Sequence, residues 1–160
     1  MARGYKGFGV LLHLLVDYSG LPIAITSTPA NGNEREEVIP LLQQFDVEGY
    51  ASQLCNRPMV TLEADKGYDS NPLRQKLLNR GILPYILRRK TKKPNPNKPP
   101  HKETAKTFSI KSVRWQVERA HSSLKGKVRR LRVRWERSAQ AWTAILMASL
   151  SYFWIELLFG

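Results

Sequence analysis

An aspartate stands where a short apolar run of the sequence ends. Residues 59–64 are apolar except for one charge, Asp65 follows them, and Gly67 begins a polar turn. If 59–64 form a strand of an open α/β sheet, Asp65 lies just outside the carboxyl end of that strand, where such sheets tend to bind ligands. A carboxylate in that place can hold a divalent metal ion. An ordinary turn or helix-capping aspartate is the alternative, and this residue alone does not decide between them.

A second carboxylate occurs in a basic segment that favours a helix. On such a helix Glu118 shares a face with Arg114 and Lys125, and also with His121 and Ser122, at spacings of three and four residues. That face presents one carboxylate flanked by two cations. The alternative is an ordinary Arg114–Glu118 pair on a solvated helix.

The positive charge of the chain is confined to one segment. The formal net charge is +13; residues 1–87 hold 8 Lys/Arg against 9 Asp/Glu, residues 88–137 hold 18 against 3, and residues 138–160 hold none against 1. This predicts a polyanionic partner, with nucleic acid ahead of an acidic membrane, because a merely solubilising face would mix signs. The cations expected to contact DNA phosphates are Lys125, Lys127, Arg129, Arg130, Arg132 and Arg134. Trp115 and Trp135 could stack on bases or pack in the core.

The elements expected to position these residues begin with a β-hairpin. Residues 10–16 and 21–26 are apolar runs around a polar turn that ends in Gly20. Asn33 follows and, as a preferred N-cap residue, is expected to cap an amphipathic helix whose first turn is acidic. Strand 59–64, a helix over 72–80 stopped by Gly81, and strand 82–87 follow.

The remainder of the chain is basic and then apolar. Residues 91–107 are rich in proline and lysine and predict a mobile basic loop, or a plain linker. Helices are expected over about 109–159, as one long basic helix followed by an apolar one. The order of elements predicts a mixed α/β fold.

Two apolar segments raise the question of a secreted or membrane protein, and each contains residues that argue against it. Arg3 and Lys6 before the apolar run 8–16 imitate a secretory signal, but a histidine interrupts that run. Residues 139–159 approach spanning length, but their polar residues favour a buried helix. Cys55 is the only cysteine, which fits a reducing cytosol and excludes an internal disulfide.

Taken together in this order, the segments resemble bacterial insertion-sequence DDE transposases, whose catalytic domain has an RNase H-like, retroviral-integrase-like fold. Residues 65–70 (Asp-Lys-Gly-Tyr-Asp-Ser) resemble the motif of the second catalytic carboxylate. Arg114, Glu118 and Lys125 match the spacing of the third-carboxylate signature. Residues 13–17 with 20–22, and residues 28–31, resemble the hairpin and the turn after it. The resemblance covers nearly the whole chain.

The resemblance implies a role for each matching residue. Asp65 and Glu118 are expected to bind metal, Arg114 and Lys125 to assist near DNA, and Tyr68 to belong to the motif around Asp65. The expected cofactor is Mg²⁺ or Mn²⁺, since a two-metal mechanism uses ions about 3.5–4 Å apart, held by carboxylates and substrate phosphate.

The sequence departs from the family at two positions. The family has a tyrosine three residues before the arginine, and here that position is Lys111. The family's first catalytic aspartate lies on a strand that precedes the hairpin, and Asp17, the only acidic residue before Glu34, falls in the hairpin turn. Asp17 is therefore a poor substitute ligand, and the mixed sheet flanked by helices is expected with its first strand missing.

The expected function is DNA transposition, by phosphodiester hydrolysis and strand transfer, as part of a DDE transposase. Residues 1–160 are then a partial catalytic domain, inactive alone, so it is open whether the chain itself is an enzyme. A non-catalytic DNA-binding regulator of a full-length transposase is the alternative. The expected partners are double-stranded DNA, at element ends and target, and an upstream fragment or a full-length transposase, with no membrane. The expected location is the cytoplasm, with the nucleoid.

Overall fold

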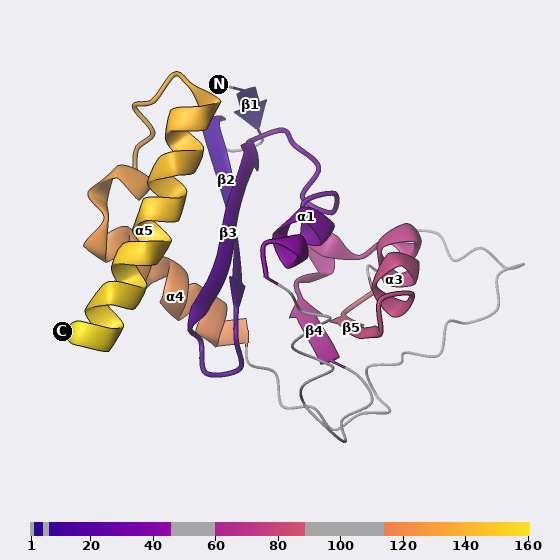
Figure 1. The fold of residues 1–160 in the computed structure, drawn as a ribbon. Helices are drawn as coiled ribbons and strands as arrows, with labels where there is room; N and C mark the ends of the chain where they lie inside the picture. Colours follow the sequence, from indigo (N-terminus) through magenta and orange to yellow (C-terminus); the bar gives the residue numbers. More distant parts are fainter. Residues whose placement is uncertain (1, 5–6, 46–59, 89–113) are drawn as a thin grey trace, which may run out of the picture. The chain divides into compact units, whose positions relative to one another are not determined.

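The computed structural model describes residues 2–4, 7–45, 60–88 and 114–160. The chain divides into two compact units: unit 1 is Met1–Asp46 with Trp115–Gly160, and unit 2 is Val47–Arg114. Strands and helices occur in both (Figure 1), which confirms the mixed α/β class. The basic loop expected at 91–107, Cys55 and Lys111 lie outside the described residues.

Unit 1 is built on an antiparallel hairpin. Strand β1 (Ala2–Gly4) pairs with the start of β2 (Gly7–Val16), and β2 pairs with β3 (Pro22–Pro29) in a register that places Leu14 opposite Ile25. Gly20 has φ +89° in the turn, which explains why the sequence needs glycine there. The predicted hairpin is confirmed, and the apolar run that imitates a signal sequence forms β2.

The helix after the hairpin begins later than its sequence indicated. Residues 34–37 form turns, and α1 (Val38–Gln43) starts only after them; Asn33 accepts a hydrogen bond from Arg35 N–H at 3.3 Å. Pro40 accounts for the shift, because a helix from residue 34 would place proline in its interior, whereas α1 keeps it in the first turn. The apolar face is as predicted, with Val38, Leu41 and Leu42 buried.

Two helices complete unit 1. Helix α4 (Arg114–Lys127) is followed by the short 3₁₀ helix η3 (Arg129–Leu131), a stretch without helix, and α5 (Ala139–Phe159). The single long basic helix expected from the sequence is therefore wrong, since α4 ends at Lys127, next to Gly126. Figure 1 shows α5 running along the hairpin. The core joins both helices to it through Leu14, Ile25, Ala120, Leu124, Leu131, Trp142 and Leu146.

Helix α5 is buried on one face only. Trp142, Leu146 and Ser149 are buried at helical spacing, and the Trp142 indole donates to Ser27 Oγ at 2.9 Å. The opposite face and the C-terminal end expose large apolar side chains: Met147, Tyr152, Ile155, Leu157, Leu158 and Phe159. The expectation of a buried helix is thus correct for one face and wrong for the rest. Within the described residues, α5 is the one helix long and apolar enough to span a membrane.

Unit 2 is a parallel pair of strands joined through a helix. Strand β4 (Val60–Ala64) pairs with β5 (Ile82–Ile86), with Val60 opposite Ile82, and the connection holds the 3₁₀ helix η1 (Lys66–Tyr68) and α3 (Asn71–Leu78). Ser70 caps α3, whose first turn contains Pro72, and Gly81 has φ +70° after it. These elements confirm the predicted strand, helix and strand.

Candidate functional site

Asp65 lies at the carboxyl end of β4, as predicted. Its backbone is extended, and its Oδ1 accepts the Lys66 N–H at 2.7 Å, so that it caps η1. Its side chain is half exposed, and Oδ1 lies 3.6 Å from Arg114 Nη2. The capping role that the sequence left as an alternative is therefore real. It leaves an exposed carboxylate at a strand end, where a ligand can reach it.

A buried ion pair fixes the loop that carries Asp65. Arg74 on α3 donates to Asp69 Oδ1 at 2.9 Å, and the two side chains are only 11% and 12% exposed. The same guanidinium donates to the carbonyl of Ile86, the last residue of β5. The end of the loop is therefore tied to α3 and to β5. This arrangement separates the two acids of the motif: Asp69 is structural, and Asp65 faces solvent.

Glu118 and its neighbours occupy one side of α4. Glu118 and Arg114 are exposed, and Lys125 and His121 are half-buried, whereas the buried residues of this helix are Ala120 and Leu124. The predicted helical face is thus confirmed.

Arg114 takes a partner that the sequence did not indicate. Its ion pair, among the described residues, is with Asp65 and not with Glu118, so the ordinary pair within the helix is not formed. Arg114 and Asp65 both belong to unit 2, and Glu118 belongs to unit 1. Convergence of Asp65 and Glu118 therefore remains a prediction.

The donor chemistry of the two carboxylates suits a hard divalent cation. Both are exposed and offer carboxylate oxygens, which Mg²⁺ and Mn²⁺ prefer. No group of three or more His, Cys, Asp or Glu side chains with metal-binding geometry occurs within residues 2–4, 7–45, 60–88 and 114–160. At least one further ligand would have to join Asp65 and Glu118.

Asp17 is fully engaged in the hairpin turn. Its Oδ1 accepts the Leu21 N–H at 2.8 Å and, like Oδ2, the Ser19 hydroxyl, at 2.8 and 2.9 Å. Its backbone carbonyl accepts the Gly20 N–H at 3.1 Å. These contacts explain the aspartate by turn formation alone, in agreement with its rejection as a substitute ligand.

Several of the predicted DNA-binding cations hold unit 1 together. Lys127 pairs with Glu156 at 2.5 Å, Arg132 Nε donates to the Lys125 carbonyl at 3.0 Å, and Arg134 lies over the Trp142 ring at 5.5 Å. Arg130 pairs with Glu136 at 2.9 Å but keeps two thirds of its side chain exposed. Each remains a positive charge near solvent, so the segment stays basic while its shape is fixed by internal contacts.

The two tryptophans in the basic region are exposed. Trp115 is 55% and Trp135 is 79% exposed, and the core-packing alternative is wrong for both. The other two tryptophans fill that role, since Trp142 is 2% exposed and Trp154 donates its indole N–H to the Pro22 carbonyl at 2.8 Å. Glu136 is a further residue whose role the sequence did not indicate. It is the one acidic residue between Arg119 and the start of α5, and its largely buried carboxylate pairs with Arg130.

Two histidines are held neutral inside unit 1. Burial lowers the pKa of His13 below 6.5, against the opposing attraction of Glu37 and Glu34. His13 Nε2 lies 2.8 Å from Thr28 Oγ1. Burial also lowers the pKa of His121, and the positive charges of Lys125 and His13 add to that effect. Both side chains are therefore ill suited to carry positive charge at neutral pH.

Comparison with known proteins adds to this picture. The family described as Transposase DDE domain matches residues 2–154. A protein of Burkholderia cepacia, whose name assigns it as a transposase for insertion sequence element IS402, is 35% identical over 135 residues. The matched region is 84% of this chain and 57% of that protein, so the chain spans little more than half the length of its relative. No solved structure matches.

Proposed function

Because the chain belongs to the DDE transposase family of insertion sequences, we propose that it forms part of a catalytic domain that cuts and joins DNA, with Asp65 and Glu118 as metal ligands. The observation that carries the proposal is the exposed Asp65 carboxylate at the end of β4, in contact with Arg114, the first residue of the helix that bears Glu118. DNA transposition is the activity that the family implies.

An RNase H-like sheet is the proposed architecture. Within the described residues, β4 pairs only with β5, and β2 pairs from Val10 onward only with β3. In this architecture a further strand pairs with β4 and brings the first aspartate beside Asp65. Asp17, the only acidic residue before Glu34, does not supply that aspartate, because its side chain is used in the hairpin turn.

The proposed roles follow from what each side chain can do. Asp65 and Glu118 would hold Mg²⁺ or Mn²⁺, which supplies Lewis-acid activation of an attacking oxygen when bound. Arg114, close to Asp65, is placed to attract a phosphate oxygen beside the metal ligand and to orient it by hydrogen bonds. Lys125, two turns after Glu118, adds a positive charge along the same helix face. Exposed Arg129 and Arg130 extend the phosphate-binding surface beyond α4.

Paramagnetic Mn²⁺ tests whether the two carboxylates share one site. Titration of the 160-residue chain should broaden the amide signals of residues 66–68 and 117–119 at the same Mn²⁺ concentrations. The variant Asp65→Asn should lose broadening at both places, because one ion needs both ligands. Glu34→Gln, which removes another carboxylate, serves as the matched control and should change neither. Broadening around Glu118 that survives Asp65→Asn would refute a shared site.

Catalysis is tested on DNA that carries the ends of the element. We expect the 160-residue chain to bind this DNA without cutting it, since a third carboxylate is required. Metal-dependent strand transfer by this chain alone would refute that expectation. The rival function, a DNA-binding regulator, makes a different prediction. If binding is the whole function, the double variant Asp65→Ala/Glu118→Ala keeps its full effect on a full-length transposase in the same reaction.

A further inference from the structure

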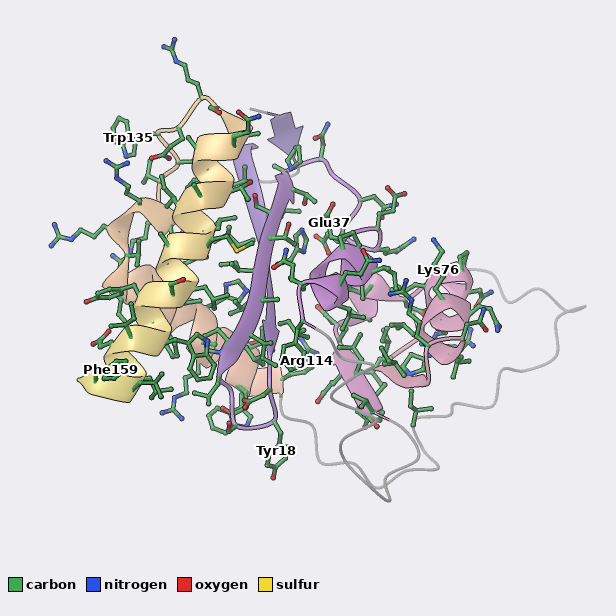
Figure 2. The ribbon with its side chains drawn as sticks, viewed as in Figure 1. Tyr18, Glu37, Lys76, Arg114, Trp135 and Phe159 are labelled. Carbon is green, nitrogen blue, oxygen red and sulfur yellow. The ribbon has the colours of Figure 1, made fainter. Side chains whose placement is uncertain are left out.

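The segment between α4 and α5 presents an aromatic ring in a frame of positive charge. We infer that Trp135, in the loop Arg129–Arg137, stacks on an unpaired DNA base, so that the loop binds single-stranded or locally opened DNA. This inference deepens the proposed function, on which it rests for the identity of the nucleic acid, and it adds a binding site separate from Asp65 and Glu118. Figure 2 shows the Trp135 side chain projecting from this loop.

The loop is built around Glu136, an inward-facing carboxylate. Its side chain is 10% exposed; Oε1 accepts from Arg130 Nη1 at 2.9 Å, and Oε2 accepts the Trp135 N–H at 3.2 Å. The carbonyl of Glu136 accepts from Arg134 Nε at 2.9 Å. Three hydrogen bonds thus converge on one residue and fix the backbone on both sides of Trp135. The ring is held outward by a defined loop, which lowers the entropy cost of binding.

The remaining contacts anchor the loop to the core of unit 1. The guanidinium of Arg134 lies over Trp142, which is 2% exposed, and Leu131 is buried at the other end of the loop. Arg132 Nε donates to the Lys125 carbonyl in the last turn of α4. From residue 133 to residue 137 exposure alternates: Arg134 and Glu136 turn inward, whereas Val133, Trp135 and Arg137 turn outward. This period of two is that of an extended chain, and it places Trp135 on the solvent side.

The exposure of the Trp135 ring is not explained by packing within unit 1. A tryptophan normally buries most of its large apolar surface, as Trp142 does in the same unit. Trp135 leaves 79% of its surface in water although its backbone is held in place. The charged groups around it are cationic at the surface, since Arg129, Arg130 and Arg137 are exposed and the carboxylate of Glu136 is not. A ligand that is both flat and anionic matches this combination.

Single-stranded DNA has both properties. Its phosphates meet the arginines, and an unstacked base offers a free π-face to the indole, whereas the bases inside a duplex are already covered by their neighbours. Stacking depends little on sequence, because every base has such a face. The loop is therefore expected to prefer an opened strand over a closed duplex, and to do so without reading its sequence.

Binding of labelled oligonucleotides tests the inference. The full 160-residue chain is titrated into a 20-nucleotide single strand and into the duplex of the same sequence, at one fixed salt concentration. Trp135→Ala should weaken single-strand binding roughly tenfold and duplex binding less than twofold. Trp135→Phe should recover most of the affinity, and the salt dependence should stay unchanged because no charge is removed.

Matched variants separate stacking from other effects. Trp115→Ala removes the other exposed tryptophan and should leave single-strand affinity within about twofold. Glu136→Gln keeps the indole but weakens the support of the loop, and should lose part of the single-strand preference. Equal losses on single strand and duplex, or no loss in Trp135→Ala, would overturn the inference. If Trp135→Ala lost binding to anionic vesicles but kept its binding to DNA, the ring would belong to a lipid-binding surface. That result would overturn the inference too.

The outcome is independent of the metal site. Asp65→Asn should leave the ratio of single-strand to duplex affinity unchanged, and Trp135→Ala should leave Mn²⁺ broadening around Asp65 and Glu118 unchanged. If the Mn²⁺ experiment fails and the Trp135 result holds, the proposed metal ligands are wrong and the base-stacking loop stands. The converse pattern leaves the metal site intact and removes the role of Trp135.

Discussion

Exchange of Asp69 for Asn should destabilise unit 2 far more than exchange of Asp65 for Asn, although the two acids lie in one short motif. Asp69 and Arg74 form a largely buried pair at 2.9 Å, and loss of one partner of a fully buried pair costs about 3–5 kcal/mol. Asparagine still accepts one hydrogen bond, so we expect about 2–4 kcal/mol for Asp69→Asn. Asp65 is half exposed and 3.6 Å from Arg114, a geometry worth at most about 1 kcal/mol.

Amide hydrogen exchange measures the stability cost of Asp69→Asn and of Asp65→Asn within unit 2. Exchange in β4, α3 and β5 reports the free energy of opening of unit 2 by itself, which avoids treating a chain of two units as a single transition. A double-mutant cycle of Asp69→Asn with Arg74→Met should give a coupling of about 2 kcal/mol, against less than about 0.5 kcal/mol for Asp65→Asn with Arg114→Met. Mn²⁺ broadening should show the opposite order, with the larger loss in Asp65→Asn.

Three outcomes would contradict the roles assigned to Asp65 and Asp69. If the two exchanges cost the same stability, the division of roles is wrong. If Asp69→Asn abolishes Mn²⁺ binding in a protein whose β4 and β5 amides stay protected, Asp69 is a ligand. A large coupling between Asp65 and Arg114 would likewise show that this pair is structural.

Three further predictions concern unit 1. Leu146→Ala should cost about 2–5 kcal/mol in urea denaturation, because Leu146 is 1% exposed in the core, whereas the exposed Leu158→Ala should change stability by less than about 0.5 kcal/mol. Gly20→Ala should cost about 1–3 kcal/mol of stability, since φ is +89° and an added Cβ would lie 2.6 Å from a glutamine side-chain oxygen of α4. Gly126→Ala should stabilise the protein by up to about 1 kcal/mol, because Gly126 lies in a helix and an added Cβ would have nothing within 4 Å. A loss of stability in both variants would contradict this reasoning. Because burial lowers the pKa of His13 in the folded protein, stability falls as the pH drops below about 6.5, by at most about 1.4 kcal/mol per pH unit. His13→Gln should flatten this dependence in denaturation curves, and an unchanged slope would speak against it.

The sequence determined the features that depend on neighbouring residues. The hairpin turn follows from Asp17 and Gly20, and the start of α3 follows from Ser70 and Pro72; each acts over a few positions of the chain. The place of Asp65 at a strand end follows from the apolar run before it. The start of α1 was also local information, since Pro40 forbids the earlier start that the acidic residues suggested.

Tertiary structure alone decided how side chains of one type were divided between core and surface. Of the four tryptophans, Trp142 donates to Ser27 and Trp154 to Pro22, partners 115 and 132 residues away, while Trp115 and Trp135 remain exposed. Nothing near these residues in the chain separates the buried rings from the two exposed ones. Burial depends on which distant surface arrives to cover a side chain, and that is fixed only when the hairpin and the C-terminal helices pack together.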